Sequence, residues 1–189
     1  IGQFPHEAPS IQAIQIINQN QRGDGVIVRN VRLTFDTPNR AAFEIRLLLP
    51  PKNRESETQD LPLLLTQPRH YQIAWGEAAV ERGYVVCFYP GVDYNHREEA
   101  FPGYENAWRT FQKEYPNATW SSSLGIQSWL ASRSLDYLLG DQSGLPVNPE
   151  RVGIIGHSRY GMQSLYAAAF DERFTAVVSR SAGSPAAAG

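Results

Sequence analysis

The chain has 189 residues, of which 42% are hydrophobic and 19% charged, and its 17 basic and 19 acidic side chains give a formal net charge of -2. This composition is typical of a globular domain, and it excludes a long disordered tail, a coiled coil and a basic nucleic-acid-binding surface. No apolar run approaches the roughly 18 residues that a membrane helix needs, so we expect no membrane span. The single cysteine, Cys87, lies in an apolar run, which favours a buried thiol over a nucleophile and provides no zinc site.

The N-terminal part of the sequence changes character near residue 22. Residues 1–21 have no clean hydrophobic period and end in a Gln/Asn cluster, which predicts an N-terminal arm ahead of a domain over residues 22–189. Apolar residues then alternate over residues 25–36, with one slip at Arg29-Asn30 that indicates a bulge or turn. Residues 42–49 alternate in the same way, so the two segments predict an antiparallel pair of strands.

From residue 61 the apolar residues form short continuous runs, which are typical of strands covered on both faces. Such strands are predicted at 61–65, 84–89, 151–155 and 174–179. Helical spacing predicts helices from about residue 73 to a glycine stop at Gly83, from 119 to 139, and from 159 to 170. Together the elements predict an α/β fold, with a mostly parallel sheet, helices on both faces and antiparallel N-terminal strands.

The run Gly153-Ile-Ile-Gly-His-Ser-Arg-Tyr-Gly161 places Ser158 at the junction of a buried strand and a helix. This pattern predicts a nucleophile elbow, in which a strained turn exposes the serine hydroxyl and Gly156 removes a side chain that would collide. The helix N-terminus beginning at Arg159 would offer a backbone N–H group to a developing oxyanion. A structural helix cap at Ser158 is the alternative interpretation.

The elbow sequence resembles that of the α/β-hydrolase superfamily, and more closely that of glucuronoyl esterases (4-O-methylglucuronoyl methylesterases) and related bacterial carbohydrate esterases. The resemblance covers about residues 61–183. It is supported by three further segments, at residues 120–138, 148–152 and 169–174.

The resemblance implies ester hydrolysis by a Ser-acid-His triad without a metal or organic cofactor. Ser158 matches the nucleophile and Arg159 matches an arginine that holds the oxyanion, although an exposed helix residue is the alternative for Arg159. Two positions depart from the family pattern. Met162 stands where a sugar-contacting lysine is usual, and Ser181 stands where many members place the catalytic acid.

The histidines raise a difficulty, because the triad of this fold runs serine, acid, histidine along the chain and no histidine follows Ser158. His157 is expected to pack or to orient the turn rather than act as the base. Gln67, His70, His157 and Met162 are candidates for lining the site, with a plain loop role as the alternative for His70. His96 is interpreted as a solvated loop residue.

No acidic residue stands out as the partner of Ser158. Asp171 and Glu172 are predicted to lie in a surface turn paired to Arg173, and Asp93, at the end of a strand, is the better stand-in candidate for the acid. We therefore expect the acid and histidine to lie on a second chain or on a missing C-terminal segment that would also carry the last strands of the fold.

The leading hypothesis is a serine carboxylic-ester hydrolase acting on a carbohydrate ester, with Ser158 as nucleophile. A non-catalytic hydrolase-like binding domain is the alternative, and a serine peptidase of the same fold is a weaker one. The first residue, Ile1, indicates a processed or trimmed product. A secreted or periplasmic location is expected, and the cytoplasm is left open.

Overall fold

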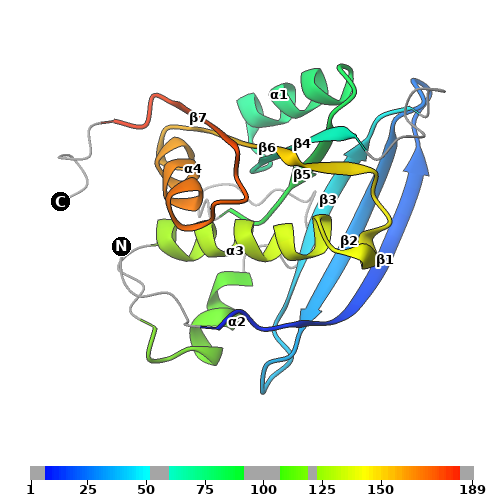
Figure 1. Ribbon diagram of the computed structural model, residues 1–189. Helices are drawn as coiled ribbons and strands as arrows, with labels where there is room; N and C mark the ends of the chain where they lie inside the picture. Colours follow the sequence, from blue (N-terminus) through cyan, green and yellow to red (C-terminus); the bar gives the residue numbers. More distant parts are fainter. Residues whose placement is uncertain (1–6, 52–59, 92–106, 119–122, 184–189) are drawn as a thin grey trace.

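The computed structural model describes residues 7–51, 60–91, 107–118 and 123–183 (Figure 1). Within these ranges one seven-stranded sheet has the strand order β1-β2-β3-β5-β4-β6-β7. Its strands are β1 (Ile11–Gln21), β2 (Ile27–Phe35), β3 (Ala42–Leu49), β4 (Leu61–Thr66), β5 (Val85–Phe88), β6 (Val147–His157) and β7 (Ala176–Arg180). The helices are α1 (His70–Val80), α2 (Ala107–Glu114), α3 (Ser123–Leu138), α4 (Arg159–Phe170) and the short η3 (Asp141–Ser143).

The sheet has an antiparallel half and a parallel half. Strands β1, β2, β3 and β5 pair antiparallel in that order, whereas β5, β4, β6 and β7 run parallel to one another. Helix α1 covers one face, and α2, α3 and α4 lie on the other (Figure 1). The predicted α/β fold, with antiparallel N-terminal strands and helices on both faces, is therefore confirmed.

The arm predicted for residues 1–21 is wrong for residues 11–21, which form the edge strand β1. The strand lacks an apolar period because its polar side chains pair with polar side chains of β2 instead of entering the core. Asn30 Nδ2 donates to Asn18 Oδ1 at 2.9 Å, and Arg29 Nε donates to Gln19 Oε1 at 2.7 Å. An edge strand can be held by its backbone ladder and such cross-strand pairs without burying much apolar surface.

The slip predicted at Arg29-Asn30 is not a bulge in β2, because the pairing of β2 with β3 is unbroken from Ile27 to Thr34. Instead, the slip marks the point along β2 at which the apolar side chains change from one face of the sheet to the other. Val28 packs with the cluster under α1, whereas Val31 packs with the larger cluster on the opposite face. The extra residue lies in the neighbouring strand, where β1 shifts register between Ile16 and Asn18.

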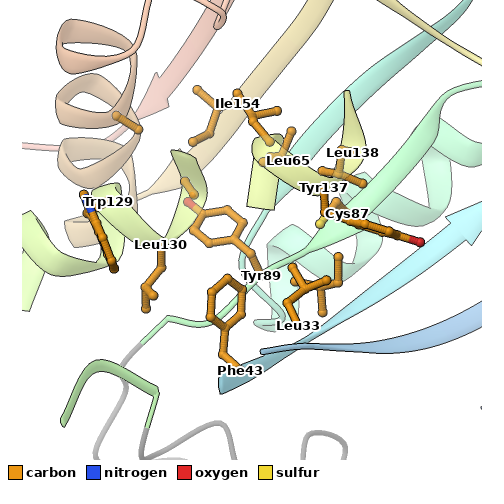
Figure 2. Packing of buried hydrophobic residues seen from close by; sticks show 14 of the residues in the cluster. Leu33, Phe43, Leu65, Cys87, Tyr89, Trp129, Leu130, Tyr137, Leu138 and Ile154 are labelled. Atoms are coloured by element: carbon orange, nitrogen blue, oxygen red, sulfur yellow. The ribbon is translucent and has the colours of Figure 1, made fainter. Parts of the chain in front are cut away.

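The larger apolar cluster joins the face of the sheet opposite α1 to α2, α3 and α4. Figure 2 shows Tyr89 in the middle of this cluster, with Phe43 and Leu130 close by. Cys87 is fully buried there, as predicted, and burial raises the pKa of its thiol.

Two helical regions differ from the sequence-based expectation. Residues 93–117, read as a polar stretch, contain helix α2, whose Phe111 is fully buried. Helix α3 is buried on nearly every side because α4 packs against it, so polar residues such as Gln127 and Ser128 lie inside the protein. None of the helices in the described ranges is both long enough and apolar enough to cross a bilayer.

Candidate active site

Ser158 is the single residue between the end of β6 and the start of α4. Its backbone has φ 58° and ψ -126°, a region that residues with a side chain rarely adopt. The Ser158 N–H donates to the Arg180 carbonyl at 2.8 Å, and the Ser158 carbonyl accepts from the Gly161 N–H at 2.9 Å. These bonds hold the strained turn, and the residue itself is exposed at the carboxyl end of the parallel strands.

The side chain of Ser158 does not cap α4. A serine at the N-cap position usually has extended backbone angles and accepts a hydrogen bond from an N–H group of the first turn. Ser158 has neither feature, since its φ is positive and no side-chain capping bond is formed. The Ser158 hydroxyl therefore does not act as a helix cap, which was the alternative interpretation.

Two glycines allow the close packing around this turn. A Cβ atom on Gly156 would lie 2.1 Å from the carbonyl oxygen of Tyr160 and 2.7 Å from Ser164 Oγ. A Cβ atom on Gly161 would lie 2.9 Å from Ser179 Oγ. The predicted need for a residue without a side chain at Gly156 is confirmed, and the reason is contact with the backbone of α4.

Arg159 is the first residue of α4 and is exposed. The first N–H groups of a helix have no carbonyl partner within the helix, and the N-terminal end of the helix dipole is positive. The Arg159 N–H therefore lies at the positive end of the helix dipole, directly after Ser158.

On the α1 side of the sheet, two aromatic residues contact the ends of β6 and β7. The Tyr71 and His157 rings lie 5.4 Å apart between centroids, and the Arg180 guanidinium carbon lies 5.8 Å from the centre of the Trp75 ring. His157 and Arg180 are paired residues of the two parallel strands. The His157 side chain thus takes part in packing α1 against the turn.

The other side chains expected to line the site lie in different places. Gln67, just after β4, and Met162, in α4, are 1% and 6% exposed, so both lie beneath the surface that presents Ser158. His70 begins α1, rather than lying in a loop, and its side chain is outside the described residues. Lining of a substrate site by these three residues, and by His157, stays a prediction.

The predicted pairing of Asp171 with Arg173 is confirmed, with Asp171 Oδ2 2.7 Å from Arg173 Nη2. The expected surface position is wrong for Asp171, which is 9% exposed, although Glu172 is exposed. Arg173 also contacts Asp136 of α3 at 2.9 Å, so this ion-pair network joins the end of α4 to α3. Asp171 is therefore part of a structural ion-pair network with Arg173 and Asp136.

The carboxyl group of Asp171 should contribute to stability in a pH-dependent way. Burial alone would raise its pKa, but hydrogen bonds from Arg173 and Ser132 outweigh burial and lower the pKa. Because the folded pKa is below the unfolded one, the contribution is present above about pH 4 and is lost as pH falls through the folded pKa. We expect Asp171→Asn to lower the free energy of unfolding by about 2 kcal/mol at pH 7, because a buried charged partner is lost.

Urea unfolding monitored by circular dichroism between pH 3 and pH 7 measures this effect. The difference between the variant and the parent should shrink below about pH 4. Glu172→Gln, a change at the exposed neighbour, is the matched control and should stay within about 0.5 kcal/mol of the parent. An equal effect of the two substitutions would contradict the assigned network.

Three further positions were singled out by the sequence: Ser181, Asp93 and His96. Ser181, exposed directly after β7, has a positive φ of 52°. Asp93 and His96 lie outside the described residues. Among the described residues, no group of three or more His, Cys, Asp or Glu side chains is arranged to hold a metal ion.

Sequence reasoning missed a set of buried polar residues beneath the turn. The Tyr89 hydroxyl is hydrogen-bonded to Gln67 and to Gln163, and all three side chains are at most 1% exposed. A weak signal was available, because a tyrosine at the end of a buried apolar run needs a partner for its hydroxyl. The identity of the partners depends on tertiary packing and could not be read from the sequence.

The strand order, the parallel half of the sheet and the turn at Ser158 define an α/β hydrolase fold. A family model described as "Glucuronyl esterase, fungi" matches residues 76–189, so the chain belongs to the glucuronyl esterase family. A search of curated proteins found no match.

Solved structures agree on the fold. A glucuronoyl esterase from Solibacter usitatus is 22% identical with a TM-score of 0.64, and the alignment covers 94% of this chain and 53% of that one. A CE15 glucuronoyl esterase from Teredinibacter turnerae is 22% identical with a TM-score of 0.62, covering 97% of this chain and 48% of that one. An acetyl xylan esterase from Paenibacillus sp. R4 is 15% identical with a TM-score of 0.53, covering 90% and 53%. The chain therefore spans about half the length of these solved relatives.

Proposed function

We propose that this protein is a serine carboxylic-ester hydrolase that acts on a carbohydrate ester, with Ser158 as its nucleophile. The observation that carries the proposal is the backbone of Ser158, which has a positive φ and forms no capping bond. A protein maintains such a strained residue when its side chain is needed outside the turn. A nucleophile elbow has this requirement, since the hydroxyl must be exposed above the sheet.

In the proposed reaction, the Ser158 hydroxyl oxygen attacks the ester carbonyl carbon and the carbonyl oxygen becomes negative. The Arg159 N–H, the Arg159 guanidinium and an N–H group of the loop after β4 would hold that oxygen. A histidine takes the Ser158 hydroxyl proton during the attack and gives it to the alcohol oxygen as the ester C–O bond breaks. The same histidine then takes a proton from water, which attacks the acyl-enzyme, and returns it to the Ser158 oxygen as the acid is released.

The histidine and the acid of the triad are proposed to lie on residues outside this 189-residue sequence, because no histidine follows Ser158. Within the described residues, β7 is paired on one side only, with β6. Val177 and Val178 of β7 are 39% and 53% exposed, so the strand has room for a neighbour on its open edge and apolar surface to bury. We place the completing segment, or second chain, along this edge.

The substrate class is proposed from the relatives, which are named as glucuronoyl and acetyl xylan esterases. One name describes an ester at the acid group of a sugar acid, and the other describes an acetyl ester at a hydroxyl group of xylan. A non-catalytic binding domain is the second candidate, favoured by the absence of a histidine after Ser158 and by Ser181 at the position expected for the acid.

Reaction with a fluorophosphonate, followed by denatured intact mass and peptide mapping, tests the proposal. We expect a single adduct on the Ser158 peptide of the complete protein, because the probe reports an activated serine. Hydrolysis of a uronic acid methyl ester and of an acetylated xylo-oligosaccharide would then distinguish the two substrate classes. Absence of an adduct together with absence of turnover on both esters would favour the binding domain.

A further inference from the structure

Tyr89 lies at a meeting point of three elements beneath the Ser158 turn. Its backbone N–H donates to the Thr66 carbonyl at the end of β4, at 3.2 Å. Its hydroxyl is hydrogen-bonded to the side chain of Gln67, the first residue after β4, and to the side chain of Gln163 in α4. A single side chain therefore bridges the loop after β4 and the helix that follows the serine.

The buried amides around this hydroxyl are suited to a directional chain of hydrogen bonds. The Oε1 atoms of Gln67 and Gln163 are buried without a hydrogen-bond partner. Turning one of the two amides by 180° exchanges its nitrogen and oxygen, and that Oε1 then accepts the hydrogen of the Tyr89 hydroxyl. One glutamine then donates to Tyr89 and the other accepts from it, so in either orientation both glutamines stay bonded to the same hydroxyl.

Each end of this bridge is rigidly connected to a part of the proposed reaction site. The Gln163 carbonyl accepts from Ser128 Oγ of α3 at 3.0 Å, which fixes α4 from the opposite side. The first turn of the same helix donates from Gly161 to the Ser158 carbonyl. At the other end, Gln67 begins the loop whose N–H group would complete the oxyanion site, and its carbonyl accepts from the Arg69 N–H at 2.9 Å.

We infer that Tyr89 is a positioning residue, which sets the distance between the loop after β4 and the start of α4 through its two glutamine partners. This inference rests on the proposed function, and it assigns Tyr89, Gln67 and Gln163 to the alignment of the oxyanion donors with Ser158. Tyr89 does not touch the ester. Donors displaced by about 1 Å can lower the rate by roughly a hundredfold, so a bridge of this kind affects catalysis more than substrate binding.

The test uses Tyr89→Phe in the complete protein, with kcat and KM measured on an ester that the parent hydrolyses. We expect kcat to fall about tenfold and KM to stay within twofold, because only the alignment in the transition state is disturbed. Tyr137→Phe, at another buried tyrosine in the last turn of α3, is the matched control and should leave kcat within twofold. Equal kcat in the parent and Tyr89→Phe overturns the inference.

A second variant separates positioning from simple stability. The triple substitution Gln67→Met, Tyr89→Phe, Gln163→Met removes every polar atom of the bridge, and such apolar replacement of all partners can be nearly neutral for stability. We expect its melting temperature to approach that of the parent while kcat stays low. If kcat recovers together with stability, the bridge is merely structural and the inference is wrong.

Failure of this inference can be distinguished from failure of the proposed function. If Ser158→Ala abolishes turnover while Tyr89→Phe keeps the parent kcat, only the positioning role is lost. If Ser158→Ala leaves turnover intact, the proposed nucleophile is wrong and the role of Tyr89 fails with it.

Discussion

Ser158→Ala is expected to lower kcat for ester hydrolysis by about 10⁴-fold to 10⁶-fold in the complete protein, because no other group replaces the attacking oxygen. The fold should persist, since Ser158 makes its structural hydrogen bonds through the backbone N–H and carbonyl. Residual turnover would come from the oxyanion donors and from binding alone. The measurement is kcat on the preferred ester, with circular dichroism and the melting temperature reporting the fold.

Ser158→Gly provides a control that separates strain from chemistry. Glycine adopts a positive φ readily, so this variant should be inactive but more stable than Ser158→Ala by about 1 kcal/mol. Alanine keeps the strain that serine has at φ 58°. Parent-like turnover in either variant would contradict the assignment of the nucleophile, and equal stability of the two would contradict the strained turn.

Gly156→Ala is expected to destabilise the protein by about 3 kcal/mol or more, and poor recovery of folded protein is an expected consequence. The added Cβ atom would lie 2.1 Å from the Tyr160 carbonyl oxygen and 2.3 Å from its carbonyl carbon. Both are backbone atoms at the start of α4, so no rotation of a side chain relieves the contact. Either β6 or α4 must move, which would also displace Ser158.

Gly153→Ala, in the same strand, is the matched control for this prediction. Its added Cβ atom would meet Leu64 Cδ1 at 3.4 Å, which is an ordinary van der Waals contact. We expect a change within about 1 kcal/mol, measured as the shift in the urea unfolding midpoint with an unchanged slope. Similar costs at both positions would show that the close approach of α4 to Gly156 is not present in solution.

The sequence was most informative where one physical constraint determined the pattern. The buried runs of β4 and β5 and the start of α4 at Arg159 were predictable, because double-sided burial and the glycine-rich turn leave direct signals. The family resemblance was likewise carried by residues around Ser158. These features depend only on the local sequence and on whether one or both faces of a strand are buried.

Elements held by partners distant in sequence were not predictable in the same way. Strand β1 was missed because its side chains satisfy each other across an edge, as Asn18 does with Asn30, and leave no apolar period. The burial of Asp171 and Gln163 depends on the packing of α4 against α3, which periodicity in either helix does not specify. The break in the alternation of apolar residues along β2 was visible in the sequence. Its cause, the packing of α1 over one face of the sheet, was not.

The two edges of the sheet differ in their tendency to bind other chains. Strand β1 carries a row of Gln and Asn side chains, whereas β7 exposes Val177 and Val178 and, in the part of the chain that the structure describes, pairs on one side only. On the neighbouring helix α4, Leu165 and Phe170 are 39% and 54% exposed. An unpaired edge flanked by apolar side chains is a template for strand addition, so molecules in which β7 has no neighbour should associate and precipitate as their concentration rises. If the proposed completing segment covers β7, the yield of soluble protein should therefore depend on how soon after synthesis it pairs with this strand.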